Sequence, residues 1–299
     1  MKDLEVHRID GHYPTGPLIE RFQRHGIVIL KDFLAPNLRD RVRGIAQRRL
    51  DMARKNEGVL RFPQFPLADF LKGDILAVRE LDQLKYIFFQ QDLLEAVRAL
   101  LDSRELIYWG DSSIQFGEAA RGFHKDNVER GDSSHDDWQG DYGLVRCGFY
   151  FQDHTTNSGG LKVRLASHRI ADHVTGKIAD IPTTFGDVVV WNMRLTHSGN
   201  NRKLWALRRL ALHPRVEAAM PAWLVLPEQQ RRISAFCAFG RPGSHADRYI
   251  TNMNARDDDY RPYFQHARRL DEAADLLAGY GVSFVQPNGY YGELDDARD

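Results

Sequence analysis

The chain has 299 residues, of which 42% are hydrophobic and 11% aromatic, a composition that excludes collagen-like, low-complexity and disordered proteins. Its 41 basic and 41 acidic side chains cancel to a formal net charge of 0, so no overall field attracts nucleic acid or an anionic membrane. We therefore expect no nucleic-acid partner, and any charged ligand is recognised locally.

Cysteine content and hydrophobic runs predict the compartment. Cys147 and Cys237 are too few for a disulfide framework. The first residues show no apolar signal-peptide core, and no run of about 18 apolar residues predicts a membrane span. We expect a cytoplasmic protein without a transmembrane segment. Neutral charge is still compatible with peripheral membrane contact, and the oligomeric state is left open.

Helical patterns dominate the N-terminal part. Residues 17–26 predict a short helix that ends at a glycine, and Ile27–Leu30 follows as a buried strand. Apolar residues at helical spacing predict a second helix over about 37–53. A third helix is expected to begin at Asp92, which has the spacing of a capping box with Glu95.

The middle of the chain changes to short β-prone runs separated by turn residues. These runs are Ser112–Phe116, Val145–Phe151, Asp187–Trp191 and Leu207–Leu212. Their spacing predicts a sandwich or jelly roll. Beyond about residue 217 strand signals become rare, and Tyr263–Ala278 returns to helical periodicity. We expect one domain, with a helical part over about 14–104, a β core over about 105–215 and a C-terminal extension over about 217–299.

Three H-x-D triplets are candidates for metal binding, because an extended backbone points both side chains of such a triplet to one face. They begin at His124, His135 and His245. His135 lies in a polar loop pattern, and no strand series follows His245, so we favour His124 with Asp126. His197, just beyond the strong strand pattern GDVVVWNM, is the natural third ligand.

Two imidazoles and one carboxylate form the ligand set of non-haem Fe(II) oxygenases. From the residues alone, an equal alternative is that these three are structural side chains with satisfied hydrogen bonds. An arginine favours the functional interpretation. On a strand over 207–212, Arg208 shares a face with Leu210 and Leu212, and an interior arginine needs an anionic partner such as a dicarboxylate co-substrate.

The ordered segments GFHKDN, YFQDHTTNSGGLKVRLASHR, FGDVVVWNMRLTHSGNN and LRRL resemble the phytanoyl-CoA dioxygenase-like family of Fe(II)/2-oxoglutarate oxygenases. The N-terminal ERFQRHGIVILKDFL extends the resemblance, which covers roughly residues 15–215. It implies a double-stranded β-helix, a cupin-like jelly roll that is mainly β with flanking helices. In that resemblance His124 and Asp126 match the proximal iron ligands, His197 the distal one and Arg208 the 2-oxoglutarate arginine.

The family chemistry implies Fe(II), 2-oxoglutarate and O2 as cofactor and co-substrates, and hydroxylation of a C–H bond with release of succinate and CO2. Asp126 stands where related halogenases carry a small residue, which disfavours halogenation. Desaturation, epimerisation and ring formation use the same ligands and stay open. The sequence departs from the family at Leu165-Ala166, where Pro-Gly is frequent.

Further site residues are weaker predictions. Ser198 and Gln115 are candidates to contact 2-oxoglutarate, with a turn hydrogen bond and the opposite strand face as their alternatives. Asn127, Tyr150 and Trp191 are candidates to contact substrate, and simple packing is the alternative for the two aromatics.

Two features of the sequence suggest opposite classes of substrate. The acidic stretch 127–142 reads as a lid that favours a cationic or hydroxyl-rich molecule, with a solvated loop as the alternative. Four arginines after the core would instead bind phosphate or carboxylate: Arg231, Arg232, Arg241 and Arg248. The family's substrates suggest a polar small molecule, either sugar-containing, such as a lipopolysaccharide sugar, or a biosynthetic intermediate.

Two other classes of function fit the same scaffold. One is a non-catalytic jelly-roll binding module, because a fold does not determine a function. The other is a cupin-type metal-dependent isomerase or hydrolase, in which Arg208 would bind substrate.

Overall fold

The computed structural model describes residues 2–55, 59–60, 68–71, 88–117, 122–199, 201–208, 210–228, 232–255 and 270–285. Its α-helices are α1 (Thr15–His25), α2 (Pro36–Arg54), α4 (Gln91–Leu101), α5 (Pro214–Ala218), α6 (Ser244–Ala255) and α8 (Leu270–Ala278). Short 3-10 helices are η1 (Lys2–Leu4), η4 (Asp136–Trp138), η5 (Ser167–Arg169) and η6 (Ala222–Leu224). None of the described helices is long and apolar enough to cross a membrane.

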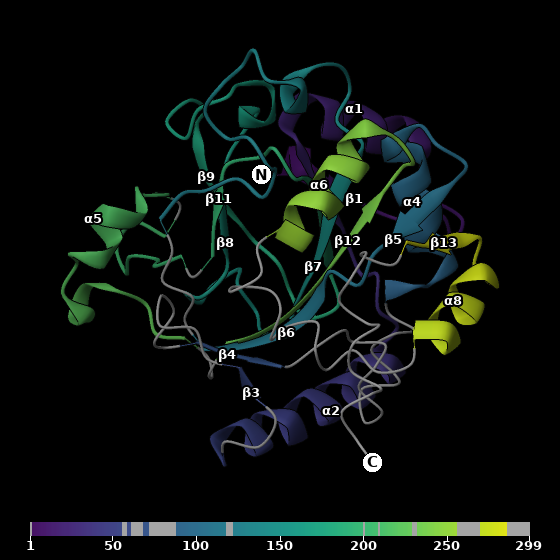
Figure 1. The fold of residues 1–299 in the computed structure, drawn as a ribbon. Coiled ribbons are helices and arrows are strands. Elements are labelled where there is room, and N and C mark those ends of the chain that lie inside the picture. Colours follow the sequence, from purple (N-terminus) through teal and green to yellow (C-terminus); the bar gives the residue numbers. More distant parts are fainter. Residues whose placement is uncertain are drawn as a thin grey trace.

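The strands, in chain order, are β1 (Glu5–Val6), β2 (Ile27–Leu30), β3 (Val59–Leu60), β4 (Ala68–Leu71), β5 (Leu106–Tyr108), β6 (Ser112–Gly117), β7 (Leu144–Tyr150), β8 (Leu161–Arg164), β9 (Ile178–Ile181), β10 (Val188–Asn192), β11 (His197–Ser198), β12 (Ile233–Gly240) and β13 (Val282–Phe284). They form two sheets (Figure 1). The main sheet has the order β1-β2-β10-β7-β12-β6-β4-β3; off this path β5 pairs with β12, and β13 pairs with β5. The second sheet has the order β11-β8-β9.

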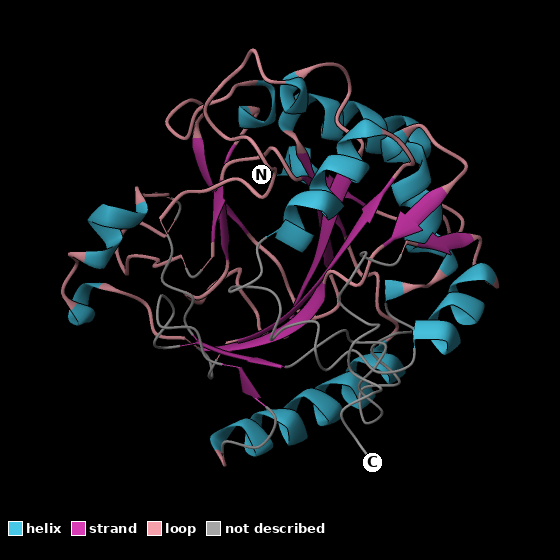
Figure 2. Ribbon diagram, viewed as in Figure 1, coloured by secondary structure: helices cyan, strands magenta, loops and turns pink. Residues whose placement is uncertain are grey.

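The central neighbours of the main sheet, and β11 and β8 in the second sheet, are far apart in the chain, as in a double-stranded β-helix. In the main sheet β10, β7, β12 and β6 pair antiparallel. An isolated bridge between His124 and His197 continues the second sheet beyond β11. The protein therefore has the predicted jelly-roll core, with α1, α2 and α4 on the outer face of the main sheet (Figure 2).

Strand alternation divides the apolar residues between two cores. In β2, Val28 and Leu30 pack with residues of α1, α2 and α4, whereas Ile27 and Ile29 face the second sheet. All four residues are fully buried, because β2 is covered on both faces. A strand buried on both faces reads as a continuous apolar run, as IVIL does.

The predicted N-terminal elements are confirmed with small changes at their ends. α1 ends at Gly26, whose φ of 77° is the left-handed conformation that glycine adopts at a helix C-terminus. The predicted capping box is wrong. Asp92 lies inside the first turn of α4, which has no side-chain cap, and binds Arg8 at 2.7 Å.

Two other expectations need correction. The strand expected over Leu207–Leu212 is not formed by its described residues, 207–208 and 210–212, which lie in loops and turns. The β core does not end near residue 215, because β12 pairs with both β6 and β7 in the centre of the main sheet. Its sequence, ISAFCAFG, is an uninterrupted apolar run typical of a central strand. Residues 263–269 of the expected last helix lie outside the described residues, and α8 covers the remainder.

The departure from the family pattern at Leu165-Ala166 leaves the turn in place. Ala166 adopts a φ of 63°, a region that glycine enters at lower cost, and its N–H donates to the carbonyl of His25. The turn leads into η5.

Candidate metal centre

Backbone pairing brings the three predicted ligands together at one end of the second sheet. The N–H of His124 donates to the carbonyl of His197 at 3.0 Å, and the reverse bond is 2.8 Å. The N–H of Asp126 donates to the carbonyl of Met193 at 2.9 Å. Two segments about 70 residues apart in the chain are thereby held side by side.

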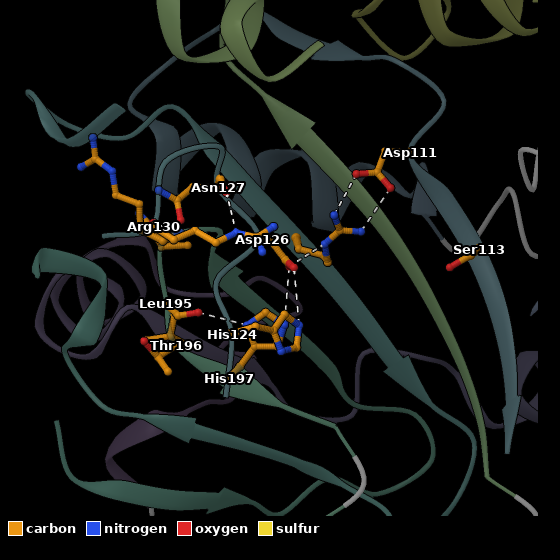
Figure 3. A network of polar contacts seen from close by, with 12 residues as sticks. Asp111, Ser113, His124, Asp126, Asn127, Arg130, Leu195, Thr196 and His197 are labelled. Carbon is orange, nitrogen blue, oxygen red and sulfur yellow. Dashed lines mark hydrogen bonds and ion pairs between the residues drawn. The ribbon is translucent and has the colours of Figure 1, made fainter. Parts of the chain in front are cut away.

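The side chains of His124, Asp126 and His197 converge between the two sheets (Figure 3). One ligand atom from each lies within 4.8 Å of the other two. Nε2 of His124 is 3.8 Å from one carboxylate oxygen of Asp126, and Nε2 of His197 is 3.6 Å from the other. Two imidazoles and a carboxylate are a donor set suited to Fe(II).

Both imidazoles are oriented by the backbone. Nδ1 of His197 lies 3.0 Å from the carbonyl oxygen of Leu195, and Nδ1 of His124 lies 3.2 Å from that of Gly122. A proton on Nδ1 that is donated to a carbonyl leaves Nε2 with its lone pair, which is the arrangement found for most metal-bound histidines. The donor atoms and their orientation both fit a metal ion.

The two other H-x-D triplets form no such group. His135 accepts the backbone N–H of Asp137 through Nδ1 at 3.0 Å, so it caps η4. In the third triplet, Asp247 is exposed on α6. Elsewhere in the described part of the chain only one further group has suitable spacing, at the surface, and its members are His12, Asp92 and Glu95.

The structure does not support Arg208 as the interior arginine. Its side chain is exposed, and its guanidinium lies 6.0 Å from the ring of Trp205. The alternation argument fails here because the segment is not a strand. Thirty-four residues separate His197 from Arg232, which immediately precedes β12, and the described ones include α5 and η6.

Arg232, unlike Arg208, lies in the interior. It immediately precedes β12 and is 2% exposed, and its Nε donates to the carbonyl of Gly159 at 2.9 Å. The guanidinium lies 5.7 Å from the centre of the Tyr150 ring. A Cβ added to Gly199 would be 3.4 Å from Nη2 of Arg232, so this cation reaches the strand of His197 two residues beyond the ligand.

The surroundings of Arg232 are polar and buried. His154 is 1% exposed, and burial together with the charge of Arg232 lowers its pKa to about 4. The pKa of Tyr150 is raised by burial, although Arg232 opposes the rise. His154 is therefore neutral near pH 7, and Arg232 is a buried positive charge beside it.

Gln115 and Ser198, the two residues predicted to contact 2-oxoglutarate besides the arginine, have different surroundings. Gln115 lies on the face of β6 opposite Ile114 and Phe116, which pack under the helices, so it shares the interior face with Ser113. The hydroxyl of Ser198 donates to the carbonyl of Gly199 at 3.2 Å, as its turn alternative predicted.

Trp191 lies next to the metal ligands, whereas Asn127 serves the following loop. The ring of Trp191 is 5.5 Å from that of His197 and packs on Phe236 at 6.1 Å. The amide nitrogen of Asn127 donates to the carboxylate of Asp137 at 2.7 Å, so this group is directed into the loop.

The segment 127–142 is anchored to the body of the protein. Arg194 donates to the carbonyl oxygens of Asp137, Gln139 and Gly140 at 2.8–3.3 Å. Its guanidinium also lies 4.4 Å from the ring of Tyr142. The segment is therefore held in place beside Asp126 by contacts with Arg194.

Comparison with known proteins shows the fold. No protein-family model matches the chain, and no curated protein matches its sequence. The non-haem α-ketoglutarate-dependent epimerase SnoN from nogalamycin biosynthesis is 13% identical, with 76% of this chain and 82% of SnoN covered at a TM-score of 0.52. The chain has the fold of the non-haem iron and 2-oxoglutarate-dependent enzymes.

Two further structures have the same architecture. AviO1 from Streptomyces viridochromogenes Tue57 is 19% identical, with 77% of this chain and 96% of AviO1 covered at a TM-score of 0.50. EctD from S. alaskensis is 14% identical, with 79% of this chain and 80% of EctD covered at a TM-score of 0.51. A second structure of SnoN contains Fe3+, α-ketoglutarate and nogalamycin RO.

Proposed function

We propose that this protein is an Fe(II)/2-oxoglutarate-dependent oxygenase of the phytanoyl-CoA dioxygenase-like kind. One observation carries the proposal: in the fold of such enzymes, His124, Asp126 and His197 converge, with Nε2 of each histidine within 3.8 Å of the Asp126 carboxylate. Iron held there would supply O2 activation coupled to the decarboxylation of 2-oxoglutarate to succinate. The protein would bind, orient and shield the reactants.

Arg232 is the residue we assign to the distal carboxylate of 2-oxoglutarate, in place of Arg208. Two residues of extended chain span about 6.6 Å, so the position of Gly199 lies about the length of a short dicarboxylate beyond His197. A guanidinium binds a carboxylate through two parallel hydrogen bonds, and burial strengthens that interaction. Gln115 and Ser198 remain candidates for additional contacts.

We propose hydroxylation of a C–H bond in a polar small molecule, either a biosynthetic intermediate or a sugar. Asp126 supports oxygenation over halogenation, because the full set of two histidines and one carboxylate leaves three positions for 2-oxoglutarate and O2. The origin of SnoN in antibiotic biosynthesis supports an intermediate of that kind. Trp191, beside His197, is the aromatic best placed to contact such a substrate, with Tyr150 deeper in the interior.

Anaerobic titration tests the proposal. Metal-free protein is mixed with Fe(II) and then 2-oxoglutarate, and the weak visible charge-transfer band of the chelated keto acid is followed. We expect the band in the wild type and in Asp247→Ala, and not in Asp126→Ala. Asp247 is the matched control because it is the exposed acid of another H-x-D triplet. A folded wild type without the band would favour a binding module or an enzyme that uses another metal.

A further inference from the structure

The carboxylate of Asp126 is held from behind by a buried network that the predicted site did not include. Nε of Arg146, on β7, donates to Oδ2 of Asp126 at 3.0 Å (Figure 3). The same guanidinium donates to both carboxylate oxygens of Asp111, at 3.2 and 2.8 Å. The side chains of Arg146, Asp126 and Asp111 are only 15, 14 and 10% exposed.

Helix α6 closes this network. The hydroxyl of Tyr249 donates to Asp111 at 3.0 Å and accepts from Nη2 of Arg146 at 3.3 Å. Tyr249 is 7% exposed and packs on Trp109 with ring centres 5.5 Å apart. Every polar group of the network is thus paired with another, which fixes the orientation of the Arg146 guanidinium.

The same face of α6 also holds the loop that follows Asp126. His245 lies three residues before Arg248 and four before Tyr249, the spacings that place its side chain beside each of theirs on a helix. Nε2 of His245 lies 3.2 Å from Nη2 of Arg194, the anchor of the loop. Nη1 of Arg248 is 3.5 Å from the buried carboxylate of Asp137.

We propose that Arg146 and Tyr249 are positioning residues for the metal centre, through which α6 of the C-terminal extension holds Asp126 in the orientation that binds the ion. The inference rests on the proposed function, because it assumes that His124, Asp126 and His197 hold a metal. Tyr249 lies outside residues 15–215, the part of the chain that resembles the oxygenase family. The motifs that carry the resemblance therefore do not include this tyrosine.

Charge explains why the support matters. Asp111 and Asp126 would repel each other in a buried site, and the single cation of Arg146 neutralises one of the two charges. The cluster keeps one net negative charge, which favours a dication beside Asp126. Without the guanidinium, Asp126 would lose the hydrogen bond that fixes its carboxylate, and a carboxylate that rotates away binds a metal more weakly.

Cobalt binding to the metal-free full-length chain tests this inference without 2-oxoglutarate or turnover. Co(II) is titrated into the wild type, Tyr249→Phe, Arg146→Gln and Arg146→Lys, and both affinity and the visible ligand-field spectrum are measured. Tyr108→Phe is the matched control, because Tyr108 is a fully buried tyrosine whose hydroxyl donates to Ser112 in another part of the core. Far-UV circular dichroism and urea unfolding establish that each variant is folded.

We expect Arg146→Gln to lose about 10- to 100-fold in Co(II) affinity, the usual effect of removing a group behind a metal ligand. Arg146→Lys should recover part of the loss, and Tyr249→Phe should lose several-fold with an altered spectrum. Tyr108→Phe should bind as the wild type does. If Arg146→Gln does not fold, the comparison of Tyr249→Phe with Tyr108→Phe decides. Equal affinity and spectra for those two variants would overturn the inference, whereas a wild type that binds no Co(II) would overturn the proposed function and this inference with it.

Discussion

The guanidinium of Arg232 lies beside the backbone of Gly199, and a Cβ at that glycine would be 3.4 Å from Nη2. This relationship connects the start of β12 to the strand of His197, across the interior between the two sheets. It places Arg232 in the interior, beside a backbone position two residues along the chain from His197, whereas Arg208 is exposed at the surface.

Replacement of Arg232 should abolish tight binding of 2-oxoglutarate. Because truncating one partner of a buried charge pair costs about 2 kcal/mol or more, Arg232→Ala should raise the Kd for 2-oxoglutarate by at least about 30-fold. Arg208→Ala is the control and should leave that Kd unchanged. Anaerobic titration of the Fe(II) complex measures both, and a strong effect of Arg208→Ala with none for Arg232→Ala would reverse the assignment.

A methyl group at Gly148 should disturb the interior next to the ligands. A Cβ there would approach the Trp191 ring to 2.8 Å and the Phe236 ring to 3.1 Å. Gly148→Ala should therefore lower the free energy of unfolding by about 1–3 kcal/mol, and it should weaken metal binding because Trp191 packs on His197.

Gly16→Ala supplies the matched control for Gly148→Ala in urea unfolding. Gly16 lies in α1 with nothing within 4 Å of an added Cβ. Gly16→Ala should leave the free energy of unfolding unchanged or raise it by up to about 1 kcal/mol. Equal effects of the two substitutions would show that the space around Trp191 is not tight.

Stability should fall as the pH drops from about 6.5 towards 4. Burial lowers the pKa of His168 to about 4, and burial followed by the charge of Arg232 does the same for His154. In this pH window the unfolded chain binds protons that the folded chain does not, so acid favours unfolding. Each histidine contributes up to about 3 kcal/mol at the lower end.

Urea unfolding at pH 7.5 and pH 5.0 measures this dependence. The free energy of unfolding should differ less between the two pH values in His168→Gln than in the wild type. His12→Gln, at an exposed histidine, should leave that difference unchanged. An unchanged difference in His168→Gln would show that this imidazole titrates alike in the folded and unfolded chains.

Removal of Arg194 should release the loop over 127–142. Three backbone carbonyls lose their donor, and the Tyr142 ring loses its cation. Arg194→Ala should raise amide hydrogen exchange in this loop by tenfold or more, because local opening then breaks fewer bonds.

Arg98→Ala is the control for the loop experiment, since Arg98 also donates to backbone carbonyls, those of Arg104 and Tyr280. It should leave exchange over 127–142 unchanged. If amide hydrogen exchange over 127–142 were as slow in Arg194→Ala as in the wild type, the contact between Asn127 and Asp137 would be sufficient to hold the loop.

Local signals in the sequence were enough to predict the β class, the N-terminal helices and the three candidate ligands. Glycine ended α1 where expected, and an apolar run marked β2, because both depend on neighbouring residues. His124 and Asp126 share a face because an extended backbone alternates its side chains. His197 was found from its place after a strong strand, and the backbone pairing of His124 with His197 confirms that the two meet.

The tertiary structure alone decided which arginine is interior and what stands behind the metal ligands. Leu207–Leu212 has the alternation of a strand, but the described residues of the segment pair with no neighbour in a sheet and leave Arg208 in solvent. Arg232, Arg146 and Tyr249 acquire their positions from strand order and from the docking of α6. Such contacts join residues more than 80 positions apart, and no local pattern determines them.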